Sequence, residues 1–260
     1  MNFLGKKKDT SEGRVLVLGG TGKTGRRVAA RLEEKGRPVR VGSRASVPAF
    51  DWDNESGWSA CLEGVTAAYI TYAPDLAMPG AADAIRAFVK LARRHGVRHL
   101  VLLSGRGEAE AQACERIVQD SGLDWTIVRS SWFNQNFSEG AFIDMVLAGT
   151  ITLPAGQTPE PFVDIDDIAD IVVTALSAPG HAGQLYEVTG PRLMTFADIA
   201  ADISSATGRT ISYVDAPHEA FVASVADSGA PKDVVWMPPP RASGMSLNRA
   251  QSSRKRLVIG

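Results

Sequence analysis

The stretch GGTGKTG at 19–25 restricts this chain to a small number of folds. It follows the apolar run RVLVL at 14–18 and precedes RRVAARLEEK, in which Val28, Ala29 and Leu32 share one helical face. A short apolar run that stops at glycines is typical of a buried parallel strand. The order of strand, glycine-rich turn and helix predicts a nucleotide-binding unit.

Two nucleotide signatures overlap in this stretch. Gly22-Lys23-Thr24 matches the end of a phosphate loop, but that loop needs another glycine five positions earlier, where Val17 stands. The G-x-x-G-x-x-G spacing instead fits a dinucleotide turn. Its glycines allow a sharp exit from the strand, close approach of a pyrophosphate and close packing of the helix. We therefore predict that the whole loop binds cofactor, through Gly19, Gly20, Thr21, Gly22, Lys23, Thr24 and Gly25.

The following segments continue to alternate between strand and helix patterns. Strands are predicted over 38–43, 65–72, 97–103, 124–129, 150–153 and 184–189, and helices over 81–95, 109–120, 142–148, 166–176 and 195–207. This alternation predicts an α/β fold, a Rossmann-type doubly wound parallel sheet with helices on both faces. Since the second half is less regular, we expect it to form a small C-terminal substrate-binding subdomain.

The chain is long enough for one large domain. We predict a disordered N-terminal tail over 1–13, an NAD(P)-binding domain over 14–237, with the substrate cleft mainly from 130 onward, and an irregular tail over 238–260. The last segment starts with three prolines and is then basic and serine-rich without apolar periodicity. A native tail and the product of a shifted reading frame both fit this pattern.

Charge and composition argue against several classes of partner. The net charge of -1 argues against nucleic acid, and no apolar run is long enough to span a membrane. The polar start lacks the core of a signal peptide, and two cysteines fit a reducing compartment, so we expect a cytoplasmic protein. No metal site is predicted: Asp164, Asp166 and Asp167 are interpreted as loop and helix-capping residues, and Cys114 as a packing residue.

The end of the second predicted strand indicates which cofactor is preferred. An NAD-specific site usually has a carboxylate there, which bonds the ribose 2′-hydroxyl. This chain has Ser43 and Arg44 instead, and an arginine can pair with a 2′-phosphate. Lys23 could add positive charge from the loop. We therefore expect NADP(H) to be preferred over NAD(H).

Several motifs in order resemble NmrA-like NAD(P)-binding proteins, which are atypical short-chain dehydrogenases/reductases. The matching stretches are VLVLGGTGKTG, VRVGSR, FDWDN at 50–54, GVRHLVLLSG at 96–105, SGLDWTIVRSSWFNQNF at 121–137 and YEVTGPRLMTFADIA at 186–200. The resemblance covers about 14–235, and GGTGKTG is also similar to the ergot-alkaloid reductase branch and its bacterial relatives.

This resemblance implies roles for particular residues. Asp51 and Trp52, near the end of an expected short third strand, would contact the adenine side of the cofactor. Tyr72, Ala73 and Pro74 would pass beside its riboses, and Ser104 would lie near the nicotinamide. Ser131 and Phe133 would belong to a wall of the substrate cleft. For Trp52, Tyr72 and Phe133, plain core packing is an equally good interpretation.

The usual catalytic pair of the superfamily is missing from the sequence. None of Tyr69, Tyr72, Tyr186 and Tyr213 is followed four positions later by lysine, so no catalytic residue is assigned. One hypothesis is an NADPH-dependent reductase of a small electrophile that needs little acid assistance, such as a quinone or an imine. The other is a non-enzymatic NADP(H) sensor that acts through a regulatory protein partner.

Overall fold

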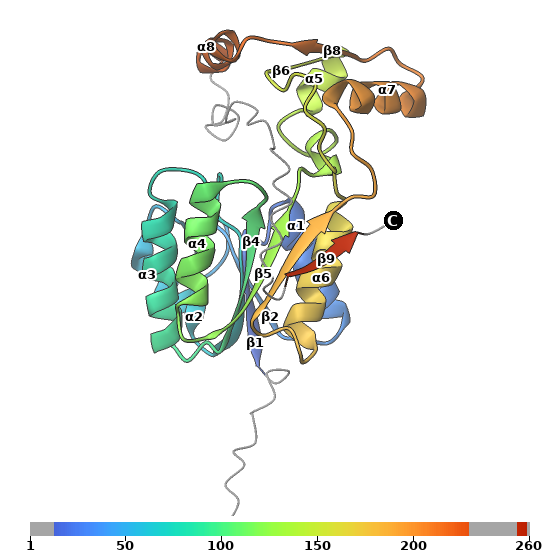
Figure 1. The fold of residues 1–260 in the computed structure, drawn as a ribbon. Coiled ribbons are helices and arrows are strands. Elements are labelled where there is room, and N and C mark those ends of the chain that lie inside the picture. Colours follow the sequence, from blue (N-terminus) through green and yellow to red (C-terminus); the bar gives the residue numbers. More distant parts are fainter. Residues whose placement is uncertain (1–12, 229–253, 259–260) are drawn as a thin grey trace, which may run out of the picture.

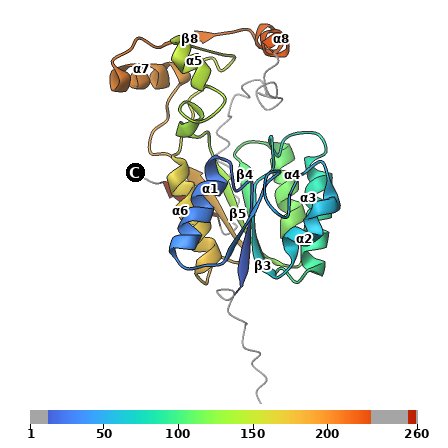
Figure 2. The ribbon, with the colours of Figure 1, turned by 180° about the vertical axis from the view of Figure 1, so that it is seen from behind.

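The computed structural model describes residues 13–228 and 254–258. A parallel sheet with helices on both faces forms the larger part, and a smaller part lies beyond one end of the strands (Figures 1 and 2). Most of the two predicted tails, namely 1–12, 238–253 and 259–260, lies outside the described residues. Within the described ranges, no helix is both long and apolar enough to cross a membrane.

The main sheet has seven strands in the order β2-β1-β3-β4-β5-β7-β9, and all neighbours are parallel. The strands are β1 (Arg14–Leu18), β2 (Val39–Gly42), β3 (Val65–Ile70), β4 (His99–Gly105), β5 (Asp124–Ser130), β7 (Gln184–Thr189) and β9 (Arg254–Val258). The chain passes from β1 to β2 on one side and then crosses to β3 on the other. Because such a reversal opens a crevice at the carboxyl ends of the strands, it marks the expected ligand site.

Helices cover both faces of this sheet, which confirms the predicted doubly wound architecture (Figures 1 and 2). One face is covered by α1 (Lys23–Glu34) and α6 (Ile165–Ser177), and the other by α2 (Trp58–Leu62), α3 (Ala81–Arg94) and α4 (Ala109–Gln119). Alternate residues of β1 enter different cores: Val15 and Val17 pack beneath α1 and α6, whereas Leu16 and Leu18 pack on the opposite face. Burial on both faces explains why this strand is almost entirely apolar.

The smaller part has a core of its own. It contains α5 (Ile143–Ala148), β6 (Thr150–Leu153), α7 (Phe196–Thr207), β8 (Ser212–Asp215) and α8 (His218–Ser228), and β6 pairs in parallel with β8. Its buried aromatic side chains are Phe137, Phe142, Phe162, Phe196 and Phe221. Thr195 caps α7 in a reciprocal capping box with Asp198.

Two segments differ from the sequence-based predictions. The expected third strand near Asp51 and Trp52 is not formed, and the chain makes only an isolated bridge from Asp51 to Asn54 before the 3-10 turn η1 (Glu55–Gly57). Indole N–H groups hold this loop, since Trp52 donates to Thr71 O at 3.1 Å and Trp58 donates to Asp51 O at 2.7 Å.

The second difference lies in the predicted irregular tail. Residues Arg254–Val258 form β9, which pairs in parallel with β7 at the edge of the sheet. An edge strand is joined by backbone hydrogen bonds, so it needs no long apolar period in the sequence.

Candidate functional site

The glycine loop after β1 is built by close backbone approaches. Gly19 has a φ of +61°, and a Cβ atom there would lie 2.2 Å from Thr71 Oγ1. A Cβ on Gly25 would lie 2.2 Å from the carbonyl oxygen of Gly19, so the first turn of α1 packs directly on the loop. Both positions therefore require glycine for the fold itself.

The amino end of α1 is left open to an anion. Gly22 is its N-cap, with no side-chain cap and no acidic residue in the first turn. A Cβ on Gly22 would meet only the carbonyl oxygen of Gly19, at 3.1 Å, so this glycine is not demanded by packing in the way that Gly25 is. Uncapped N–H groups and the positive end of the helix dipole fit the pyrophosphate of a dinucleotide.

The end of β2 presents two groups that could bind a ribose phosphate. The Oγ of Ser43 is buried and has no hydrogen-bond partner, although the backbone of Ser43 is bonded to Ser46 and Phe50. Arg44 is exposed and makes no ion pair with any residue in the described ranges. A buried unpaired hydroxyl beside an exposed guanidinium fits a phosphorylated ribose.

Lys23 contacts the segment after β5. Its Nζ donates to Asn136 Oδ1 at 2.6 Å and lies 5.9 Å from the ring centroid of Phe133. The ammonium therefore connects the glycine loop to the segment after β5.

The adenine-side residues belong to an aromatic cluster. Trp52 packs edge-on against Phe50 and at 4.9 Å from the ring of Tyr72. Trp52 and Tyr72 are both only partly buried against the core. Asp51 holds the loop through its carbonyl oxygen, which accepts from Trp58, and through Oδ1, which accepts from Asp53 N.

A cavity of about 240 Å³ opens at the carboxyl ends of β3, β4 and β5. Its lining includes five of the residues predicted from sequence: Tyr72, Pro74, Ser104, Ser131 and Phe133. Trp52 is not among the lining residues, and Ala73 only connects two that are. The strand ends thus bring together residues from three distant parts of the sequence.

Two of the three serine hydroxyls that line the cavity, those of Ser104 and Ser131, already donate to other groups of the protein. Ser104 donates to Glu115 Oε1 at 2.6 Å, and Glu115 in turn accepts from the buried Arg129. Ser131 donates to the carbonyl oxygen of Pro161. Burial, and then the charge of Asp53, raise the pKa of Tyr72. The hydroxyl groups of Ser104, Ser131 and Tyr72 are therefore not arranged as a conventional proton donor.

Carboxyl groups in the same cavity were missed by the sequence analysis. Glu108, Asp75 and Glu160 line it, and burial raises the pKa of each. For Glu108 the pKa rises to about 8, with further contributions from the nearby charges of Asp75 and Glu110. The places of Asp75 just beyond β3 and of Glu108 just beyond β4 were a usable signal, because ligands bind at the carboxyl ends of such strands.

Ion pairs hold the segment after β5 against α1. Glu139 accepts from Arg26 and from Arg27, the latter at 2.7 Å. Arg27 and Arg31 also pair with Asp166, at 3.1 and 2.6 Å. The short turn η2 (Asn134–Asn136), which carries the partner of Lys23, is thereby kept beside the amino end of α1.

The remaining residues considered as a nucleophile or as metal ligands lie in surroundings that fit a packing or capping role. Cys114 is buried against the carbonyl oxygen of Leu76, and burial raises its pKa to about 11. Asp164 caps α6 by accepting from Asp166 N. In the part of the chain that the structure describes, no group of three or more His, Cys, Asp or Glu residues is placed to hold a metal ion.

Comparison with known proteins also indicates an NAD(P)H-binding family. A sequence model described as NAD(P)H-binding matches residues 19–179. Agroclavine dehydrogenase of Claviceps fusiformis is 31% identical over 246 residues, which is 86% of this chain and 83% of that protein. NAD(P)H azoreductase of Xenophilus azovorans is 30% identical over 241 residues, or 85% and 83% of the two chains.

Solved structures share the fold. An NADPH-dependent quinone oxidoreductase of Escherichia coli, complexed with NADPH, superposes with a TM-score of 0.69 at 22% identity and covers 85% of this chain and 86% of its own. The negative transcriptional regulator NmrA in complex with NADP gives 0.62 at 17% identity, with coverage of 80% and 75%. The predicted resemblance to NmrA-like proteins and to the ergot-alkaloid reductase branch is confirmed.

Proposed function

The chain belongs to the NAD(P)H-binding family, and we propose that it is an NADPH-dependent reductase of a small electrophile such as a quinone, an azo compound or an imine. The observation that carries this proposal is the continuity of the site. An uncapped helix end suited to a pyrophosphate lies at β1, and a small cavity lies at the adjoining strands β3, β4 and β5. Relatives named as dehydrogenases and an azoreductase support reduction as the reaction class.

The preference for NADPH depends on Arg44. Its exposed guanidinium is free to bind a 2′-phosphate in a bidentate manner. Ser43 Oγ has no hydrogen-bond partner, and such a phosphate could supply one. No carboxylate follows β2 directly to bind a 2′-hydroxyl in its place.

Bound NADPH would supply a hydride to the substrate. The chain's own contribution is to bind and orient both molecules. The loop 19–25 and Arg44 would hold the dinucleotide, and Tyr72, Trp132 and Phe133 line the cavity with aromatic surface. A small, partly aromatic cavity suits a flat, conjugated acceptor.

The test is NADPH consumption by the purified protein with a panel of quinones, azo dyes and cyclic imines. Turnover with at least one class, and with NADPH preferred to NADH, is the expected result. Absence of turnover with every class, in a protein that binds NADPH, would reject the reductase and leave the second candidate.

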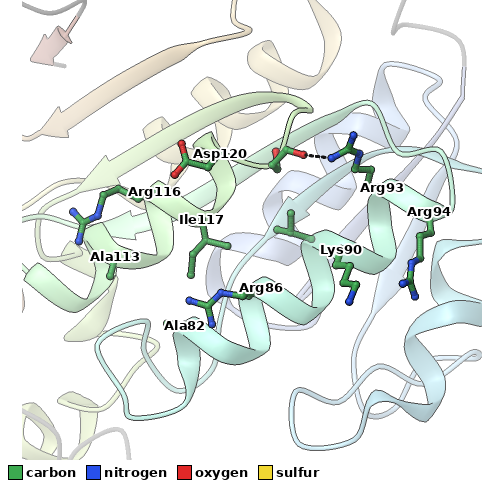
Figure 3. A pocket seen from close by; sticks show the side chains of 11 residues that line it. Ala82, Arg86, Lys90, Arg93, Arg94, Ala113, Arg116, Ile117 and Asp120 are labelled. Atoms are coloured by element: carbon green, nitrogen blue, oxygen red, sulfur yellow. Dashed lines mark hydrogen bonds between the residues drawn. The ribbon is translucent and has the colours of Figure 1, made fainter.

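That second candidate is regulation through a protein partner, and a groove between α3 and α4 favours it (Figure 3). The groove measures about 960 Å³. Its lining contains five cations and one acid: Arg86, Lys90, Arg93, Arg94, Arg116 and Asp120. Arg86 pairs with Asp83, and Arg93 donates to Ser121 O, whereas Lys90, Arg94 and Arg116 have no ion-pair partner among the described residues.

An acidic amphipathic segment of another protein is the occupant that this lining fits. Ala113 and Ile117 offer partly exposed apolar surface between the cations, which suits a peptide better than a phosphate backbone. A second copy of this chain would bring like charges together. The same helix α4 begins at Glu108 in the cavity, so it connects the groove to the ligand site.

A labelled amphipathic peptide with leucines on one face and glutamates on the other tests this surface. We expect it to bind the wild type, to bind Arg94→Glu much more weakly, and to show different affinities with NADPH and NADP⁺ present. Equal binding by both proteins, or binding that ignores the cofactor's redox state, would remove the regulatory candidate.

A further inference from the structure

We propose that Glu108 is the catalytic proton donor of the reduction, an inference that rests on the proposed function. It fills the role left open by the missing Tyr-x-x-x-Lys pair. It also identifies the preferred substrates as those whose reduced atom must gain a proton, such as the oxygen of a quinone or the nitrogen of an azo group.

The position of the Glu108 carboxyl group supports this role. Glu108 lies in the turn between β4 and α4, as the N-cap residue of α4, and it lines the cavity together with Tyr72 and Ser104. A Cβ on Gly105 would lie 2.0 Å from Glu108 Oε2. The carboxyl group is thus folded back over the last residue of β4, at the carboxyl edge of the sheet.

The surroundings of Glu108 keep its proton in place. The side chain makes no hydrogen bond or ion pair with the described residues, so its carboxyl group is available to a ligand. Arg106, the cation among the lining residues, pairs with Glu187 at 3.3 Å and with Glu160 at 3.7 Å.

The other titratable neighbours act in the same direction. Asp75 lies across the cavity in the segment after β3, and Glu110 lies on α4 itself. Together with burial, which is the largest cause, they raise the pKa of Glu108 to about 8. The carboxyl group is therefore mostly protonated at neutral pH, where an ordinary glutamate is ionised.

Other cavity groups are less suitable as the donor. The hydroxyl hydrogen of Ser104 is used in the bond to Glu115, and the raised pKa of Tyr72 makes that phenol a weaker acid. Asp75 has one oxygen bound to Ala77 N at 2.7 Å. Glu108 combines a retained proton with an unbonded carboxyl group, which matches the requirement that a general acid has a pKa near the working pH.

The step balances without another reactant. The substrate gains a hydride from the nicotinamide, and the proton of Glu108 goes to the atom on which the displaced electron pair of the substrate ends, which is the second nitrogen of an azo group or an oxygen of a quinone. The resulting Glu108 carboxylate takes a proton from water before the next turnover. A pre-formed iminium ion needs only the hydride, so its reduction is independent of Glu108.

The first experiment compares Glu108→Gln with the control Glu33→Gln, which changes an exposed glutamate in the last turn of α1. We expect kcat for a quinone or azo acceptor to fall about 100-fold in Glu108→Gln, with the reduction of an iminium ion nearly unchanged. The control should keep both activities. An equal loss for both acceptor types, or no loss for either, overturns the assignment.

The second experiment does not use activity. Infrared difference spectra between wild type and Glu108→Gln should show a protonated carboxyl band at neutral pH that disappears with a midpoint near pH 8. Asp75→Asn should move this midpoint to lower pH, since one like charge is removed. A band that is absent at neutral pH refutes the proton donor even in an active reductase. A wild type that shows the band but reduces nothing refutes the proposed function.

Discussion

At the scale of single residues, Arg44 and Ser43 determine the proposed choice between the two nicotinamide cofactors. Both follow the last residue of β2, and neither has a side-chain partner in the described part of the chain. A free guanidinium and an unpaired hydroxyl gain binding free energy when they contact a phosphate. A ribose without the phosphate would not supply these contacts.

Reversing the charge at Arg44 therefore tests the cofactor assignment. Arg44→Asp should raise the Kd for NADPH by about 10- to 100-fold, which corresponds to the loss of a charge-assisted contact, and should leave NADH binding similar or improved. Fluorescence titration with both cofactors measures this. Arg94→Asp, a charge reversal on α3, is the matched control, and equal NADPH affinity in the Arg44 variant would show that Arg44 does not contact the phosphate.

His99 makes stability depend on pH. It is buried, its Nε2 lies 2.9 Å from Thr126 Oγ1, and burial lowers its pKa from 6.5 to about 4. Because the unfolded chain binds this proton more readily, stability is retained above pH 6.5 and falls as the pH drops toward 4. The loss due to His99 is at most about 3 kcal/mol.

Urea unfolding across this range checks the prediction. The wild type should lose more stability on acidification than His99→Gln, whereas His95→Gln, which changes a less buried histidine, should follow the wild type. Parallel pH curves for the wild type and the His99 variant would mean that His99 is not neutral in the folded protein.

At the scale of elements, the loop between β1 and α1 was predictable because its signal is local. Strand, glycines and helix lie within about twenty consecutive residues, and Gly19 and Gly25 each have a nearby steric reason. Asn136 and Glu139 could not be assigned in this way, because their roles depend on segments that meet only in the folded chain. The expected third strand failed because indole hydrogen bonds hold that segment as a loop.

The two glycines at the start of α1 should have separable effects. Gly25→Ala should unfold or strongly destabilise the protein, since its Cβ would collide with the backbone of Gly19. Gly22→Ala should change stability little, because Gly22 has a φ of -82° and the added Cβ meets only one atom, at 3.1 Å. Its methyl group should instead obstruct the pyrophosphate and weaken binding of NADPH and NADH alike.

Melting temperatures and cofactor titrations distinguish the two outcomes. If Gly22→Ala binds both dinucleotides as tightly as the wild type, the pyrophosphate does not lie on the amino end of α1.

At the scale of the whole molecule, two parts meet at the ligand site. The sheet supplies the glycine loop and the strand ends, and the segment after β5, which leads to the smaller part, is held to α1 through Asn136 and Glu139 (Figure 1). The division into a regular sheet and a smaller C-terminal part could be predicted from the alternation of segments. Strand β9 could not be predicted, since its five residues pair at the edge of the sheet with β7, which lies far away in the sequence.

Glu139 tests how the two parts are joined. The hydrogen bond to Arg27 lowers the pKa of Glu139. Because the pairs are partly exposed, Glu139→Gln should reduce stability by no more than about 1 kcal/mol, and only at low salt. Its larger effect should be weaker NADPH binding, because the loop beside the amino end of α1 is released. Unchanged affinity at low salt would show that this contact does not organise the site.

The most direct test of the central claim is an anaerobic single turnover. Protein loaded with one equivalent of NADPH is mixed with a quinone, an azo dye or an iminium salt, and the absorbance of the reduced nicotinamide is followed. We expect complete oxidation in one phase with at least one acceptor, and none without acceptor. NADPH that stays bound and reduced in the presence of all three acceptors would contradict the reductase.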